Sequence, residues 1–116
     1  MFTIYHNPRC RKSREALQYL EDQNCEVKIV NYLKEPFTKE RLQEVLDQIK
    51  LKPSEVLRKN ETEWKTLPNK NQLNENEILD ILIRFPKTLE RPVVIDENSG
   101  VLARPLENLI SFLNRD

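Results

Sequence analysis

The chain has 116 residues, 33% of them charged, and a formal net charge of +0 at pH 7. This length supports one hydrophobic core, so we expect a single domain over residues 1–116, and the charge balance excludes a protein held on nucleic acid by bulk electrostatics. No apolar stretch approaches a membrane span and no signal-peptide pattern is present, so we expect a cytoplasmic protein without membrane association.

The first third of the chain predicts a βαβ unit. A β-rich run over 2–5 precedes a helical pattern from about 10 to 22, in which apolar residues share one face. A second strand is expected over 27–30. It should lie parallel to the first strand, because a helix connects the two.

The middle of the chain predicts helices separated by breaks. Thr38 can cap a helix whose apolar residues follow the i, i+3, i+4, i+7 rule up to Ile49. A short helical piece is expected after Pro53. The polar stretch 60–74 predicts an exposed loop, with Trp64 as its anchor against the body of the protein.

The last third predicts a helix, a hairpin and a final helix. A capping-box pattern at 74–77 opens a helix that Pro86 ends. Strands over 93–95 and 101–103 flank a turn that ends at the only glycine, and Pro105 is expected as the first residue of the last helix. This order predicts the α/β class with a thioredoxin-like fold. Its four-stranded mixed sheet is flanked by helices, with a helical insertion between the βαβ and ββα halves.

Residues 5–14 read Tyr-His-Asn-Pro-Arg-Cys-Arg-Lys-Ser-Arg and carry the strongest chemical signal. Cys10 lies among four cations at a predicted strand-to-helix turn. The helix dipole and the cations both favour a thiolate over a thiol. The same groups favour a bound tetrahedral oxyanion. The stretch therefore predicts sulfur chemistry on an anionic substrate.

The predicted topology brings two distant arginines to this cysteine. If the strand that opens at Arg91-Pro92 lies antiparallel to strand 2–5, its start lies beside the end of strand 2–5, next to Cys10. The hairpin then returns the chain to the same edge at Arg104. Both arginines are expected to bind the anion, and Pro92 could adopt the cis form. Other arginines, Arg84 and Arg115 among them, are expected to be solvated surface charges.

Five motifs in order resemble the glutaredoxin-linked arsenate reductases and their relatives from end to end. These motifs are His-Asn-Pro-x-Cys-x-x-Ser-Arg at 6–14, Asn-Tyr-Leu at 31–33, Leu-Arg-Lys-Asn at 57–60, Glu-Arg-Pro-Val-Val at 90–94 and Arg-Pro at 104–105. Arg11-Lys12 stands where those enzymes usually carry Gly-Thr. The chain therefore looks more like an arsenate-reductase-like subgroup with His-Asn-Pro-Arg-Cys-x-Lys-Ser-Arg.

The resemblance implies an oxidoreductase that reduces arsenate to arsenite. Cys10 would be the nucleophile, Arg58, Arg91 and Arg104 would bind the oxyanion, and His6, Ser13, Arg14 and Pro92 would support them. His6 would tune the cysteine or order its loop. The resemblance implies no bound cofactor, glutathione as the co-substrate thiol, glutaredoxin as the partner that clears the mixed disulfide, and a monomer.

Three other interpretations can be checked against residues. A phosphatase-type anion loop needs an arginine at position 16, which is Ala16. A dithiol oxidoreductase needs Cys-x-x-Cys, but the fourth position is Ser13. The alternative that stays open is a protein of the same fold without arsenate activity, either a thiol-redox protein whose Cys10 reacts with another oxidant or thiol, or a partner-binding regulator of the Spx type, although Spx-type members commonly carry the two-cysteine motif. Cys25 is expected to be a partly buried thiol rather than a resolving cysteine, and with His6 as the only histidine no metal site is expected.

Overall fold

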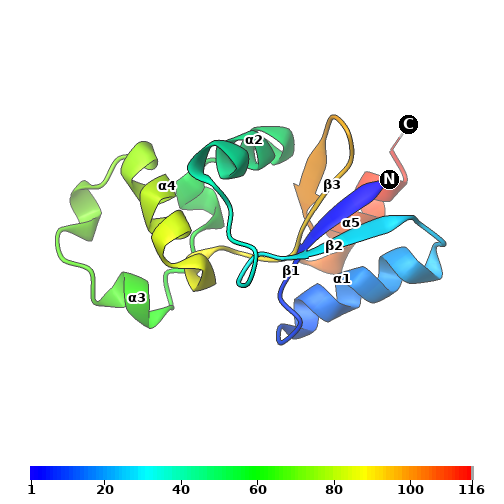
Figure 1. Cartoon of the computed structure of the whole chain (residues 1–116), viewed down its shortest axis with the longest axis horizontal. Helices are drawn as coiled ribbons and strands as arrows, with labels where there is room; N and C mark the ends of the chain where they lie inside the picture. Colours follow the sequence, from blue (N-terminus) through cyan, green and yellow to red (C-terminus); the bar gives the residue numbers. More distant parts are fainter. Residues whose placement is uncertain (116) are drawn as a thin grey trace.

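A computed structural model describes residues 1–115 and contains one four-stranded mixed sheet in the order β2-β1-β3-β4 (Figure 1). Strand β1 (Phe2–His6) lies parallel to β2 (Val27–Asn31) and antiparallel to β3 (Val93–Ile95). Strand β4 (Gly100–Leu102) closes the hairpin with β3. The predicted α/β, thioredoxin-like architecture is confirmed.

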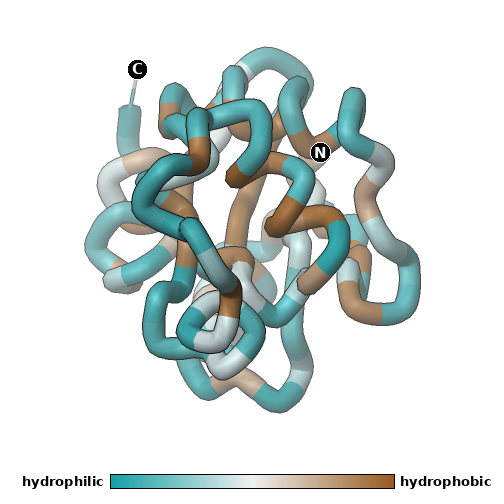
Figure 2. Tube along the Cα trace, turned by 90° about the vertical axis from the view of Figure 1, so that its left-hand side faces the viewer, coloured by the Kyte–Doolittle hydropathy of each residue, from teal (hydrophilic) through white to brown (hydrophobic). Residues whose placement is uncertain are grey.

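Alternation along the central strands gives the sheet two apolar faces. Ile4 and Val94 point to one face, which helices α1 (Arg11–Asp22) and α5 (Leu106–Leu113) cover. Tyr5, Val93 and Ile95 point to the other face, where α2 (Lys39–Ile49) and α4 (Glu75–Arg84) complete a second core cluster. The hydrophobic segments accordingly lie inward and the outer turns are hydrophilic (Figure 2). No helix within residues 1–115 has the length and apolar character needed to cross a bilayer.

The helical insertion between the two halves extends to one side of the sheet (Figure 1, green to yellow). It holds α2, a 3₁₀ turn (Pro53–Val56), the short helix α3 (Thr62–Lys65), a 3₁₀ turn (Lys70–Gln72), α4 and a last 3₁₀ turn (Pro86–Thr88). Both predicted caps are confirmed. Thr38 Oγ1 accepts from the Arg41 amide at 3.1 Å, and Asn74 and Glu77 form a reciprocal capping box.

The exposed loop predicted over 60–74 is confirmed only in part: most of its residues are exposed, but it contains short helices. This stretch holds α3 and a 3₁₀ turn, and Trp64 on α3 is only 7% exposed within the core cluster of α2 and α4. The predicted anchoring by Trp64 is thus confirmed. The segment is ordered because burial of the large indole offsets the weak helical tendency of the three polar residues in α3.

The last helix begins one residue later than predicted. Pro105 is the N-cap, with extended backbone (φ −68°, ψ 171°), and α5 starts at Leu106. Leu109 and Phe112 are its buried residues, whereas Leu106, Ile110 and Leu113 are partly exposed. Strand β4 likewise ends at Leu102, one residue before the predicted end.

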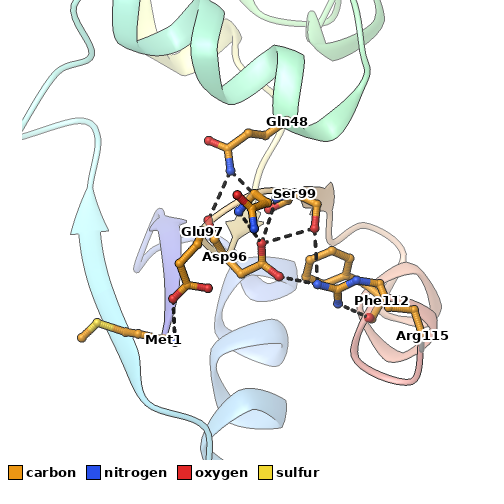
Figure 3. A network of polar contacts seen from close by, with 8 residues as sticks. Met1, Gln48, Asp96, Glu97, Ser99, Phe112 and Arg115 are labelled. Atoms are coloured by element: carbon orange, nitrogen blue, oxygen red, sulfur yellow. Dashed lines mark hydrogen bonds and ion pairs between the residues drawn. The ribbon is translucent and has the colours of Figure 1, made fainter.

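The turn of the β3–β4 hairpin is tied to helices on both faces (Figure 3). Asp96 Oδ1 accepts from the amides of Asn98 and Ser99 at 2.9 and 2.8 Å. Gln48 of α2 donates to the carbonyls of Asp96 and Ser99. The hairpin is therefore held at its turn, while its other end carries the residues of the candidate site.

Arg115 is exposed, as the sequence predicts, but it also makes specific contacts. Its guanidinium pairs with the Asp96 carboxylate and lies over the Phe112 ring, 3.7 Å from the centroid (Figure 3). Arg84 is exposed, as predicted, with its guanidinium carbon 5.1 Å from the Phe85 centroid. Arg115 is thus a structural residue far from Cys10, which makes it a useful control.

Gly100, the only glycine of the chain, does not have a positive φ, so its backbone angles do not require glycine. The space around its Cα atom does. A Cβ atom there would lie 2.5 Å from Ile95 Cγ2 and 2.8 Å from the Val94 carbonyl oxygen, below the closest normal approach. Glycine thus permits the close pairing of β3 and β4.

Candidate active site

Cys10 is the N-cap of α1 and follows β1 through the tight loop Asn7–Arg9. Its amide donates to the Asn7 carbonyl at 3.0 Å, and Asn7 Oδ1 accepts from the Arg9 amide at 3.0 Å. Cys10 is partly exposed. The predicted strand-to-helix turn is confirmed, and the sulfur lies at the positive end of the helix dipole.

Three neighbouring side chains hold this loop. Ser13 is fully buried, and its Oγ accepts from the Asn7 amide at 3.0 Å and lies 2.5 Å from His6 Nδ1. Burial, with a smaller effect of the Arg14 charge, lowers the pKa of His6. A neutral imidazole can accept the Ser13 hydroxyl proton, so His6 orders the loop through Ser13. Arg14 donates to the Pro8 carbonyl at 3.0 Å from the exposed side.

The environment of Cys10 favours the thiolate overall. Burial by itself would raise the pKa of the thiol. The backbone amide of Ser13, the guanidinium of Arg91 and the amide of Lys12 outweigh burial, so the pKa of Cys10 is lowered. The sequence predicts this direction from the helix start and the nearby cations.

Arg91 and Arg104 meet at Cys10, as the predicted topology requires. Arg104 Nη1 lies 3.8 Å from Cys10 Sγ. The Arg91 side chain donates to the Lys87 carbonyl at 3.1 Å, which fixes the guanidinium that lowers the pKa of Cys10. Pro92 is buried at the start of β3, and both Arg-Pro bonds, at 91–92 and 104–105, are cis.

Arg58 reaches the site through a pairing that the sequence does not reveal. The Arg58 amide donates to the Thr88 carbonyl and the Glu90 amide donates to the Val56 carbonyl, both at 2.7 Å. This short antiparallel contact, with a bridge between residues 57 and 89, holds Arg58 next to the start of β3.

Glu90 is a site residue without an assigned role in the sequence analysis. Its Oε2 lies 3.7 Å from Arg58 Nη1 and 3.6 Å from Arg104 Nε. The carboxylate therefore bridges two of the three arginines and holds them in one cluster. Its place as the first residue of the Glu-Arg-Pro-Val-Val motif, directly before Arg91, was the available signal.

Tyr32 is a second residue that sequence reasoning missed. It directly follows β2 and is 1% exposed. Burial raises its pKa to about 12, opposed by Arg91 and Arg58, whose charges thus act on the phenol. The resemblance includes Asn-Tyr-Leu at 31–33, which places an aromatic hydroxyl at the end of a strand and was the available signal.

Four buried donor atoms near Cys10 have no hydrogen-bond partner among residues 1–115. These atoms are Tyr32 Oη, Arg58 Nε, Arg58 Nη1 and Arg91 Nε. The two Arg58 nitrogens lie at ion-pair distance from Glu61 (3.4 Å) and Glu90 (3.7 Å), whereas Tyr32 Oη and Arg91 Nε have no such partner within residues 1–115. An unpartnered buried donor is costly, by about 1–3 kcal/mol. An oxyanion at this point would satisfy several of these donors at once through charge-assisted hydrogen bonds. The arrangement therefore combines a thiolate nucleophile with a set of donors suited to an oxyanion.

Cys25 lies away from this cluster. It follows the far end of α1, partly buried against the core of that face, as predicted. The 12 residues of α1, a helix about 18 Å long, lie between the two cysteines and keep them beyond the distance a disulfide can span. Within residues 1–115, no three His, Cys, Asp or Glu side chains are grouped in a way that could hold a metal ion.

Comparisons with known proteins agree on one family. The model of the ArsC family matches residues 5–112. An arsenate reductase of Neisseria meningitidis serogroup A is 33% identical over 112 residues, covering 95% of this chain and 96% of that protein. The uncharacterized protein YfgD of Escherichia coli K12 is 32% identical, covering 95% and 94%. The solved structure of an arsenate reductase from Vibrio cholerae has a TM-score of 0.88 at 31% identity and covers 95% of each chain.

Proposed function

The chain belongs to the ArsC family, and on that basis we propose that it is an oxidoreductase that reduces arsenate to arsenite through Cys10. One observation carries the proposal. The thiol with the lowered pKa stands beside buried donors of Arg91 and Tyr32 that have no hydrogen-bond partner within residues 1–115, and beside the Arg58 guanidinium, which Glu61 and Glu90 hold in place. Arsenate is a tetrahedral oxyanion that these donors could bind while its arsenic faces the sulfur.

In the first step, the Cys10 thiolate attacks arsenic and one oxygen leaves as water, which gives a thioester with arsenate. Arg91 and Arg104 act where negative charge concentrates during this attack. Glu90 holds Arg104 and Arg58 in position at 3.6 and 3.7 Å. Donors fixed in advance lower the barrier because they need not reorganise during the reaction.

In the second step, an external thiol attacks Cys10 Sγ in this adduct. A new S–S bond forms, the As–S bond breaks, and its electron pair stays on arsenic, which leaves as arsenite in the +3 state. The two sulfurs are oxidised to a mixed disulfide. We propose glutathione as this thiol and glutaredoxin as the partner that reduces the mixed disulfide. An external thiol is needed because Ser13 replaces a second motif cysteine and Cys25 lies at the far end of α1.

The direct test is arsenite release by the purified protein with arsenate, glutathione and glutaredoxin. Cys10→Ser should abolish release, while Cys25→Ser, which changes the other thiol by the same single atom, should retain it. Phosphate, a near-isostere of arsenate, should slow alkylation of Cys10 in a separate binding assay. Slowed alkylation without arsenite release would support the anion site but refute arsenate as substrate and favour a partner-binding role.

A further inference from the structure

A groove of about 420 Å³ lies beside the Cys10 loop, and the steps above leave most of its side chains unused. Its walls come from the loop before Cys10, the end of β2 with the segment that follows it, the residue before α3, and the segment that precedes β3. The lining residues are Asn7, Pro8, Arg9, Asn31, Leu33, Lys34, Glu61, Lys87 and Arg91. Its volume lies in the range of pockets that hold small organic ligands.

The groove is strongly cationic. Arg9, Lys34 and Lys87 form no ion pair with any residue in the described range 1–115. The only acidic lining residue, Glu61, is already paired with Arg58 at 3.4 Å. Three uncompensated cations in a concave site focus a positive potential that attracts a ligand with more than one negative charge.

The groove shares Arg91 with the oxyanion donors but does not include the others. Arg58, Arg104 and Tyr32 do not line it, whereas Arg91 does. Arg91 also acts on the Cys10 thiolate. Cys10 itself does not line the groove, but the loop that precedes it does. A ligand in the groove would therefore lie beside the Cys10 loop and could extend its thiol to the sulfur without occupying the place of the oxyanion.

We propose that this groove binds the small thiol that regenerates Cys10, and that its ligand class is a peptide-like thiol with two carboxylates, such as glutathione. Lys34, Lys87 and Arg9 would pair with the carboxylates while the thiol points to Cys10. The inference rests on the external-thiol step of the proposed function. The bond changes are those of that step: sulfur joins Sγ, and the group bound to Sγ leaves with the electron pair.

A test without arsenate isolates this step. In a Cys25→Ser background, Cys10 is converted to its mixed disulfide with 2-thiopyridine, a neutral leaving group whose release is followed by absorbance. Release rates are measured with glutathione, with neutral 2-mercaptoethanol, and with mercaptoacetate, an anionic thiol too small to span the groove. Lys34→Gln/Lys87→Gln is compared with Lys28→Gln/Lys50→Gln, which makes the same charge change at exposed sites outside the groove.

The groove variant should slow the glutathione reaction about fivefold, at roughly half a kcal/mol for each exposed ion pair. The 2-mercaptoethanol rate should stay unchanged, mercaptoacetate should slow less than glutathione, and the control variant should match the parent protein. An unchanged ratio of glutathione to 2-mercaptoethanol rates would overturn the inference. Equal slowing of the glutathione and mercaptoacetate reactions would also overturn it. The positive potential of the lysines would then explain the rates for any anionic thiol, without a binding site shaped for glutathione. A third result would overturn the inference: a groove variant that reacts normally with glutathione but whose mixed disulfide is reduced more slowly by glutaredoxin. The groove would then be a docking surface for a protein and not a binding site for the small thiol.

The groove assignment and the proposed arsenate reduction can fail independently of each other. The expected rate pattern in a protein that releases no arsenite would support the groove assignment while refuting arsenate as substrate. Conversely, the protein could release arsenite while its groove variant keeps the parental ratio of glutathione to 2-mercaptoethanol rates. That result would support arsenate as substrate and refute the groove assignment.

Discussion

Replacing Arg91 with alanine should cut arsenate-dependent turnover sharply. Arg91 differs from the other two arginines because it forms no ion pair with a carboxylate within residues 1–115, and its buried Nε has no hydrogen-bond partner there. Its guanidinium also helps to lower the pKa of Cys10. The substitution thus removes an oxyanion donor and a support of the nucleophile together.

The magnitude follows from the contacts. Charge-assisted hydrogen bonds are worth about 1.5–3 kcal/mol. By transition-state arithmetic, this loss lowers kcat/KM by about one to two orders of magnitude. The midpoint of Cys10 alkylation should also move up in pH, because a favourable charge near the thiolate is gone. Arg91→Lys should restore only part of the rate, since a point charge cannot reproduce the planar fork.

Arg115→Ala is the matched control. It removes a guanidinium that contacts Asp96 and Phe112 but lies away from Cys10. It should lower the melting temperature while keeping kcat/KM, whereas Arg91→Ala should lose kcat/KM beyond any change in melting temperature. Arsenite release and thermal unfolding are measured on all variants. If Arg91→Ala kept the turnover of the wild-type protein, Arg91 would not bind the oxyanion and the active site would be assigned to the wrong residues.

Four further predictions concern single residues. The pH midpoint of Cys10 alkylation should lie below that of a free thiol, with Cys10→Ser identifying the signal; a midpoint at or above that value would contradict the thiolate argument. Cys25→Ser should leave turnover nearly unchanged, and a dead but folded variant would rule out the external-thiol route. Because the fold lowers the pKa of His6, His6 should contribute stability that is present above pH 6.5 and lost as the pH falls through its folded pKa; His6→Gln should flatten this part of the pH–melting curve. Gly100→Ala should cost about 1–3 kcal/mol in denaturant unfolding, because its Cβ would meet Ile95 and the backbone of β3; an unchanged unfolding midpoint would refute the steric argument.

The sequence predicts those parts of the molecule that depend on local patterns. Strand alternation, the Thr38 cap and the capping box at 74–77 each involve residues a few positions apart, and all three are confirmed. Cys10 and Arg91 are brought together by sheet topology, which the order of the elements already dictates. Chain connectivity thus predicts half of the site before any side-chain contact is known.

The remaining parts depend on contacts that leave no periodic pattern. Arg58 reaches the site because two short extended segments, 56–58 and 88–90, exchange two hydrogen bonds. Neither segment is long enough to show strand alternation. The same pairing brings Glu90 between Arg58 and Arg104. Trp64 orders its loop through burial alone, which propensity cannot show.

The charge balance of the site connects the oxyanion donors with the groove. Glu61 and Glu90 offset the charges of Arg58 and Arg104, and a Cys10 thiolate offsets that of Arg91. The catalytic cluster is therefore close to neutral once the nucleophile has formed, and its pull on an anion comes from short-range hydrogen bonds. Longer-range attraction must come from cations that no carboxylate compensates, and the groove supplies them. Because such attraction is screened within about 10 Å at 0.1 M salt, added salt should slow anion capture more than the chemical step itself.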